Sequence, residues 1–179
     1  MHSDRLTELH RDHYADLVSY FARRGALDDA DEFAAEVFVI AWRKLPHDLD
    51  NPRPWLFGVA RKVLGNARRT HLRKRSLDVA VDAHLGDGRT PSVGSHTGEI
   101  AFRVDLQRAW NRLALADQEI LALTAWEGLT TGEAATALGI GRSASAMRLS
   151  RARDHLRALL TSPAVGFAAV PAEQTVEAK

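Results

Sequence analysis

Two groups of basic side chains have the residue types and spacing that suit nucleic-acid binding. The first lies in RKVLGNARRTHLRKR, residues 61–75, close to Trp55. Residues 51–77 hold eight basic side chains and no acidic one. Cations neutralise phosphates and an aromatic face accepts an unstacked base, so this group suits partly single-stranded as well as duplex DNA. The alternative interpretation is a solvated basic face with Trp55 in the core.

The second group follows a tight turn at residues 139–141. Before the turn, Thr130 and Glu133 match the reciprocal capping box S/T-x-x-E, which opens a short helix. A long helix is expected over 142–160. Helix, tight turn and second helix are the pattern of a DNA-binding helix-turn-helix, whose second helix meets base edges and phosphates. An ordinary helical hairpin with a solvated arginine face is the alternative interpretation.

Catalytic chemistry has little support in this sequence. The absence of cysteine excludes disulfides, zinc fingers and a thiol nucleophile. No phosphate-loop, zincin or nucleophile-elbow pattern is present. His10 and His13 share a helical face and could share a metal, but a structural or solvent-facing role is favoured. We therefore expect no enzyme, no catalytic residue, no cofactor and no metal site.

The composition indicates a folded chain outside the membrane. Of the 179 residues, 45% are hydrophobic and 26% are charged, as in average globular proteins. No apolar run reaches the roughly 18 to 20 residues of a membrane-spanning helix, and the first residues lack a signal-peptide core. We expect a soluble, cytoplasmic protein.

Apolar residues recurring every three or four positions predict an all-α protein. No segment alternates convincingly with period two. Residues 76–98 contain Gly, Ser, Thr, Asp and Pro with little periodicity, and are too long for a structureless loop inside one compact domain. The sequence thus predicts two small helical domains, 1–75 and 99–160, joined by a flexible linker and followed by a mobile tail, 161–179. The expected helices cover 4–24, 28–45, 54–74, 99–114, 117–127, a short segment from Thr130 to Gly139, and 142–160.

The expected helix over 28–45 carries two apolar stripes. Phe33, Val37, Ile40 and Ala41 form the first, and Phe38 with Trp42 form the second. A helix that is apolar on one face needs one partner, so a second exposed stripe suggests a further binding surface. Ordinary core packing is the alternative interpretation.

Together these patterns resemble the sigma-70 family of RNA polymerase sigma factors, in particular the compact extracytoplasmic-function (ECF) group, over about residues 5–160. The segment DDADEFAAEVFVIAWRKL is similar to the family helix that docks on the clamp of core RNA polymerase. The resemblance implies a polymerase-binding set of Asp31, Glu32, Phe33, Glu36, Phe38 and Trp42.

Two further segments carry the resemblance. NPRPWLFGVARKVLGNARRTHLRKR is similar to the segment that recognises and melts the minus-ten promoter element, and the last fifty residues before 160 resemble region four, which reads the minus-thirty-five element. The implied minus-ten set is Arg53, Trp55, Arg61, Lys62, Asn66, Arg68, Arg69 and Arg73. The implied minus-thirty-five set is Arg142, Ser143, Ser145, Arg148, Arg151 and Arg153.

The resemblance implies a sigma factor that binds core RNA polymerase and directs promoter-specific initiation. Its partners would be the polymerase and promoter DNA, and whether an anti-sigma factor is a further partner stays open. One alternative is an autonomous helix-turn-helix regulator, which would not need the acidic and aromatic surface of 28–45. Another is a module that sequesters a sigma-like partner, against which the basic segment 61–75 argues.

Overall fold

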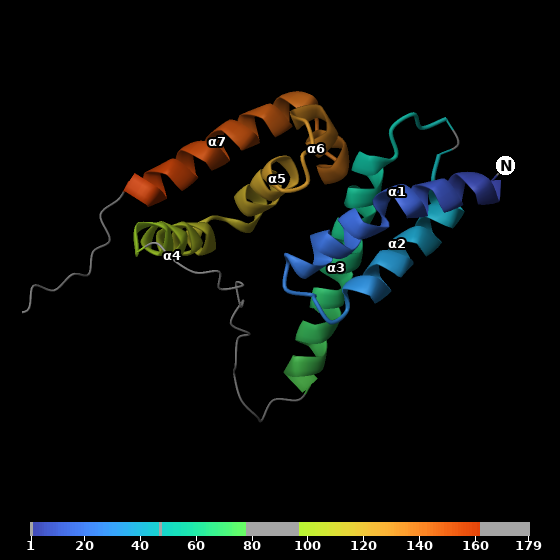
Figure 1. Ribbon diagram of the computed structural model, residues 1–179, viewed down its shortest axis with the longest axis horizontal. Helices are drawn as coiled ribbons and strands as arrows, with labels where there is room; N and C mark the ends of the chain where they lie inside the picture. The colour runs from blue at the N-terminus through green and yellow to red at the C-terminus, as the bar shows by residue number, and fades with distance from the viewer. Residues whose placement is uncertain (1, 47, 78–96, 162–179) are drawn as a thin grey trace, which may run out of the picture.

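The computed structural model describes residues 2–46, 48–77 and 97–161 of the chain (Figure 1). Within these residues there are seven α-helices and no β-strand, which confirms the predicted all-α class. The helices are α1 (His2–Ala22), α2 (Ala30–Lys44), α3 (Arg53–Leu77), α4 (Thr97–Arg112), α5 (Leu115–Ala125), α6 (Thr131–Leu138) and α7 (Arg142–Thr161). None of the described helices is long and apolar enough to cross a membrane.

Helices α1, α2 and α3 form the N-terminal half, whose core is aromatic. The ring of Tyr20 packs edge-on against Phe21 at 5.3 Å between centroids and lies 5.5 Å from Phe57. Phe33 of α2 meets Phe21 at 5.4 Å. Tyr20, Phe21 and Phe57 are fully buried, and each such side chain contributes roughly 1.5 to 3 kcal/mol of burial free energy. These contacts fix the three helices relative to one another.

The turn from α1 to α2 needs a glycine. Gly25 has φ of +81°, in the left-handed region that suits glycine beyond a helix end. The main-chain N–H groups of Gly25 and Ala26 donate to the carbonyl oxygens of Ala22 and Phe21, at 3.2 and 3.1 Å. The last carbonyls of α1 are thereby satisfied, and the chain reverses into α2.

Helices α6 and α7 form the predicted helix-turn-helix, packed on α5. The N–H of Thr130 donates to Glu133 Oε2 at 2.7 Å, and the N–H of Glu133 donates to Thr130 Oγ1 at 3.2 Å. This confirms the capping box. Gly139 ends α6 with φ of +67°, and the N–H of Ile140 donates to the carbonyl of Ala135 at 3.0 Å. The turn is therefore tight enough for α7 to cross α6.

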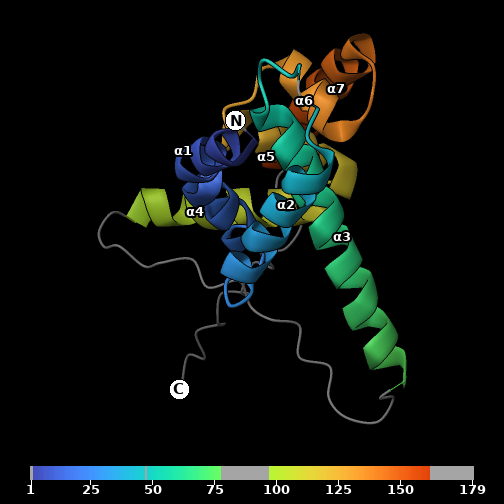
Figure 2. The same ribbon diagram turned by 90° about the vertical axis from the view of Figure 1, so that its right-hand side faces the viewer.

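Helices α4 to α7 form the C-terminal half, which packs against the N-terminal half. Buried apolar side chains of both halves make one continuous cluster. Helix α3 crosses α6 at Gly58, where an added Cβ atom would lie 3.1 Å from the carbonyl oxygen of Ala137. Figure 2 shows α5 and α6 against the first part of α3, while the end of α3 projects away from the body.

The helix boundaries lie within about three residues of the expected ones. Helix α3 continues to Leu77 and α4 begins at Thr97, so both helices extend into the predicted linker, 76–98. The three residues of α3 beyond the expected end at residue 74 lengthen the basic helix by less than one turn. Residues 78–96 and the tail beyond Thr161 lie outside the described residues, and the predicted division into tethered domains stays a prediction.

Candidate nucleic-acid and polymerase interfaces

The exposed side of α7 carries most of the predicted minus-thirty-five residues. Arg142, Ser143, Arg151 and Arg153 are exposed, and Arg148 is half-buried. Exposed guanidinium groups on a helix that follows a tight turn can reach guanine edges or phosphates in a major groove. The structure therefore leaves five of the six predicted side chains within reach of DNA.

Ser145 is the exception, and its predicted place at the DNA surface is wrong. The residue is fully buried, and its Oγ donates to the carbonyl oxygen of Thr131 at 2.9 Å. A serine is tolerated at this buried crossing because its hydroxyl donor has an acceptor there, the first carbonyl of α6. Ser145 thus positions the helix that would read DNA and does not itself face the groove.

Met147 is a surface residue of α7 that the predicted minus-thirty-five set does not include. Its side chain is 59% exposed, whereas Leu149 is buried in the core. Met147 lies one turn after Ser143 and one turn before Arg151, on the outward face. An apolar side chain there suits contact with a thymine methyl group. A helical-wheel count starting from the buried positions 145, 149 and 152 could have found it.

The basic side chains of α3 are divided between the body of the protein and its surface. Arg53 pairs with Asp16 at 3.1 Å, with its guanidinium 5.1 Å from the centroid of the Phe57 ring. Trp55 is half-buried against the core, so the alternative interpretation is correct for part of its ring. Both residues are therefore partly engaged in packing, and each keeps some exposed surface.

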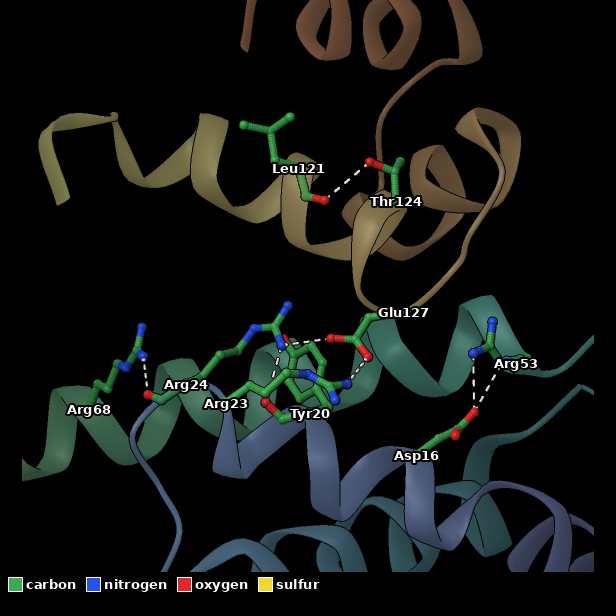
Figure 3. Close-up of polar contacts among 9 residues, drawn as sticks. All are labelled: Asp16, Tyr20, Arg23, Arg24, Arg53, Arg68, Leu121, Thr124 and Glu127. Atoms are coloured by element: carbon green, nitrogen blue, oxygen red, sulfur yellow. Dashed lines mark hydrogen bonds and ion pairs between the residues drawn. The ribbon is translucent and has the colours of Figure 1, made fainter. Parts of the chain in front are cut away.

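Further along α3, the predicted residues contact α5, the end of α1 or one another. Arg61 pairs with Glu119 of α5 at 2.8 Å, and Arg68 Nη2 donates to the carbonyl of Arg24 at 2.9 Å (Figure 3). Arg69 donates to Asn66 within the same helix. The predicted set is completed by Lys62, which is exposed, and by Arg73, whose side chain lies outside the described residues.

A cleft of about 600 Å³ separates α3 from α4 and α5. One wall is basic and comes from the end of α1 and from α3. The other wall is mixed: it includes Trp110 and Trp126, whose rings lie 4.8 Å apart, and also the polar Gln118 and Glu119. The basic lining residues are Arg23, Arg24, Arg61, Lys62, Arg68 and Arg69. Four residues of the predicted minus-ten set thus face the C-terminal half.

A buried ion-pair cluster lies beside this cleft, and the sequence reasoning did not find it. Glu127 follows α5 and is only 3% exposed. Its carboxylate accepts from Arg23 and, at 2.9 Å, from Arg24 (Figure 3). Arg24 also donates to the carbonyl of Tyr20 at 3.1 Å and lies over its ring. We refer to Glu127, Arg23 and Arg24 as the Glu127 cluster. The only sequence signal was an acidic residue between an apolar helix and Gly128.

Helix α2 exposes a face different from the one predicted. Phe38 is buried, with its ring 4.8 Å from His10 and 6.3 Å from Tyr14, so its expected place in an exposed stripe is wrong. Trp42 is 48% exposed, and Val39, one turn earlier, is 51% exposed. A spacing of three residues puts both side chains on one side of the helix.

Acidic residues border this apolar pair. Glu32 and Glu36 are exposed, and Phe33 is half-buried against Phe21. Asp31 is exposed and accepts a 2.6 Å hydrogen bond from Tyr14, which raises the pKa of the Tyr14 phenol. The exposed face of α2 is therefore acidic at its start and apolar toward its end, a pattern that suits docking on another protein.

The two histidines considered above as a possible metal pair lie beside other side chains: His10 beside Tyr14, and His13 near Arg53. His10 stacks on Tyr14 at 4.6 Å. Burial lowers the pKa of His13, and the positive charge of Arg53 lowers it further. Among the described residues no group of three or more potential ligands could hold a metal ion.

A helix-turn-helix, a basic helix and an acidic-apolar helix face are together typical of a DNA-binding protein that also contacts a protein partner. The family model for sigma-70, region 4, matches residues 103–156. RNA polymerase sigma factor NccH of Alcaligenes xylosoxydans xylosoxydans is 35% identical over 143 residues, 76% of each chain. RNA polymerase sigma factor CnrH of Cupriavidus metallidurans is 32% identical over 74% of this chain and 73% of its own.

Solved structures show the same fold. The sigma factor RpoE of Bartonella quintana, crystallised with the anti-sigma factor NepR, superposes with a TM-score of 0.62 at 21% identity, over 88% of this chain and 97% of RpoE. CnrH in complex with the cytosolic domain of CnrY gives 0.57 at 24% identity, over 88% of each chain. The chain belongs to the sigma-70 family of RNA polymerase sigma factors, in its ECF group.

Proposed function

We propose that this protein binds core RNA polymerase and directs it to specific promoters, using three separate surfaces. The exposed face of α2 docks on the polymerase, the basic face of α3 engages the minus-ten element, and the outward face of α7 reads the minus-thirty-five element. In this proposal residues 1–75 and 99–160 are the two functional domains, and residues 76–98 let both engage DNA at once. The protein acts in the cytoplasm and performs no catalysis of its own.

The α2 face is the observation that favours a sigma factor over an autonomous helix-turn-helix regulator. Val39 and Trp42 are large apolar side chains that remain about half exposed although the helix has a complete buried face. A regulator that binds only DNA gains nothing from this arrangement, whereas a polymerase subunit needs an apolar contact bordered by charge.

The basic face of α3 supports contact with promoter DNA through electrostatics. Lys62, Arg68 and Arg69 are exposed, and no acidic residue occurs between positions 51 and 77. Phosphate contacts of this kind position DNA and make binding strongly dependent on salt. A base extruded from the stack would be accepted near the start of the helix, beside Trp55.

An anti-sigma factor is a further proposed partner. The solved structures of RpoE and CnrH contain NepR and the cytosolic domain of CnrY, respectively. An inhibitory partner of this chain would have to cover the α2 face or the basic face of α3 to prevent initiation.

The deciding experiment is transcription by purified core RNA polymerase with and without this protein, on a pool of genomic fragments, with sequencing of the RNA starts. We expect starts that depend on the protein and share upstream motifs. A matched reaction with the variant Trp42→Ala tests whether these starts depend on docking. DNA binding without new starts would overturn the proposal in favour of an autonomous regulator.

A further inference from the structure

The cleft between α3 and α5 has an aromatic wall that the proposed function does not use. Its volume of about 600 Å³ lies within the range of about 300 to 1,000 Å³ that is usual for small-molecule sites. Trp55, beside which the proposed function places an extruded base, lies at the start of α3 and does not line this cleft. The tryptophans of the cleft therefore need an explanation of their own.

Trp126 offers a large aromatic surface to the cleft. Its side chain is 47% exposed although its ring packs on that of Trp110, at 4.8 Å between centroids. The main-chain N–H groups of Trp126 and Glu127 both donate to the carbonyl of Ala122, at 2.9 and 3.2 Å, which fixes the end of α5. An indole that is held in place and half exposed is a surface on which a planar base can stack.

The facing wall of the cleft carries positive charge in excess of its carboxylate partners. Its cations on α3 are exposed and follow the spacing of one helix face: Arg61, Lys62, Arg68 and Arg69. Among the contacts of the described residues, Arg61 pairs with the carboxylate of Glu119, whereas Arg68 donates to a main-chain carbonyl and Arg69 to an amide oxygen. Three cations thus keep their charge for an anion, and guanidinium groups suit the oxygens of a phosphate.

The Glu127 cluster connects the two walls. Arg68 donates to the carbonyl of Arg24, Arg24 pairs with Glu127, and Glu127 directly follows Trp126 in the chain (Figure 3). These contacts in series keep the cations of α3 and the indole of Trp126 around one space. A ligand with a planar ring at one end and anionic groups at the other could contact both walls at once.

Gly65 makes room between the walls. It lies midway along the cation-bearing face of α3 and lines the cleft. Glycine in the interior of a helix is less stable than alanine, so helix formation does not explain its presence there. Apart from its chain neighbours, the nearest atom to an added Cβ would be Nη1 of Arg69, at 4.0 Å. The space above Gly65 is therefore open to the cleft.

Hydrogen-bond acceptors lie on the α5 side of the cleft. The side-chain nitrogen of Gln118 donates to the carbonyls of Trp110 and Leu113, at 2.8 and 3.1 Å, so its side-chain oxygen is left as an acceptor. Glu119 uses Oε1 for Arg61, and a carboxylate can accept further hydrogen bonds. Adenine and guanine carry amino groups that donate to such oxygens, and their double rings stack over a larger area than a single ring.

We propose that this cleft binds a free purine nucleotide that carries at least two phosphate groups. The base stacks on Trp126, and the phosphates lie against Lys62, Arg68 and Arg69. This site goes beyond the proposed function. One consequence of it rests on that function, because a bound nucleotide occupies cations assigned to the minus-ten strand and should therefore weaken promoter binding.

Isothermal titration calorimetry of the full chain at low salt, with GDP and with ADP, tests the binding. We expect micromolar affinity for at least one of the two nucleotides, and much weaker binding of the matching nucleoside and of inorganic diphosphate, because each contacts one wall alone. Trp126→Ala should weaken nucleotide binding about ten-fold or more through loss of stacking. Lys62→Gln should weaken binding of the nucleotide and of diphosphate, but not that of the nucleoside.

A pair of variants at Gly65 tests the cleft without removing a charge. Gly65→Leu fills the space between the walls and should abolish nucleotide binding, whereas Gly65→Ala adds one methyl group to open space and should keep most of the affinity. The control Arg157→Gln removes an exposed positive charge whose ion pair lies within α7, so nucleotide binding should not change. Circular dichroism establishes that each variant is folded, and Trp126→Ala with Lys62→Gln suffices if Gly65→Leu is not.

The outcomes separate the nucleotide site from the proposed function and from promoter DNA. No binding of either nucleotide, or equal affinity in the parent and in folded Trp126→Ala, would overturn the site, whether or not the parent supports transcription. Binding that depends on Trp126 and Gly65 supports the site even if the parent fails to direct transcription, a failure that would overturn the proposed function alone. A single-stranded oligonucleotide that binds more tightly than the nucleotide and loses the same affinity in Gly65→Leu would assign the cleft to promoter DNA and overturn the free-nucleotide site.

Discussion

The hydroxyl of Ser145 donates a 2.9 Å hydrogen bond to the main-chain carbonyl oxygen of Thr131. This bond joins the first turn of α7 to the first residue of α6, across a crossing where Ser145 itself has no exposed surface. The angle between the two helices of the helix-turn-helix is therefore set partly by a polar contact. The direction in which the outward face of α7 points depends on it.

Two serines separated by one residue should differ in how much stability is lost when each is replaced by alanine. Ser145→Ala removes a hydrogen bond from a fully buried position, so we expect a loss of about 0.5 to 1.5 kcal/mol in the free energy of unfolding. Ser143→Ala changes an exposed position and should stay within about 0.5 kcal/mol of the parent. Thermal denaturation measures both. Equal stability of the two variants would contradict the structural role of Ser145.

Arg151 and Met147 should contribute to DNA binding by different physical routes. Arg151→Ala removes a phosphate or base contact, so we expect weaker binding to a promoter duplex and a salt slope smaller by about 0.9 if the contact is to phosphate. Met147→Ala removes an apolar contact and should weaken binding without changing that slope. Titrations at several salt concentrations separate the two effects. Identical slopes in parent and Arg151→Ala would place Arg151 away from the phosphates.

Features that depend on neighbouring residues in the chain could be predicted from the sequence. The capping box of Thr130 with Glu133 and the left-handed position of Gly139 are local, because each needs only residues within one helical turn. The helix-turn-helix and the seven helices followed from such signals. The basic face of α3 followed from charge alone.

Features that depend on helix rotation or on distant partners could not be predicted. Successive residues differ by about 100° around a helix, so a wrong assumption about the buried stripe put Phe38 on the surface of α2 and Ser145 on the DNA-facing side of α7. Glu127 pairs with residues about a hundred positions away, and no pattern within either segment indicates the other. The packing of the two halves is a tertiary property that the separate helix patterns do not contain.

The exposed pair on α2 should matter for polymerase binding and little for folding. Val39→Glu adds charge to an apolar contact, so we expect core RNA polymerase to bind the variant at least ten-fold more weakly. The melting temperature should change little because Val39 is 51% exposed. Ala35→Glu, one turn earlier on the exposed side, tests how far the docking face extends. Normal polymerase binding by Val39→Glu would exclude this face as the docking site.

Glu133 gives the helix-turn-helix a dependence on acid pH. A hydrogen bond from the Thr130 main-chain N–H lowers the pKa of Glu133, and those from the Thr130 hydroxyl and from Asn51 lower it further. A carboxylate whose pKa is lower in the folded state adds stability above its unfolded value, and that stability is lost as the pH falls through the folded value.

The stability that the ionised Glu133 carboxylate adds to the folded state is present at pH 7. It should be lost as the pH falls below 4.5, the ordinary pKa of glutamate. Because Glu133 is largely solvated, we expect an effect of only a few tenths of a kcal/mol to about 1 kcal/mol. Glu133→Gln mimics the protonated side chain while keeping a hydrogen-bond acceptor, so the parent should be more stable than this variant at pH 7 and nearly equal to it near pH 3. Thermal denaturation across this range, with Asp154→Asn as a second acid-to-amide control, measures the difference. A gap between parent and Glu133→Gln that stays constant down to pH 3 would mean that the charge of Glu133 adds nothing to the cap, and that its hydrogen bonds to Thr130 act as neutral contacts.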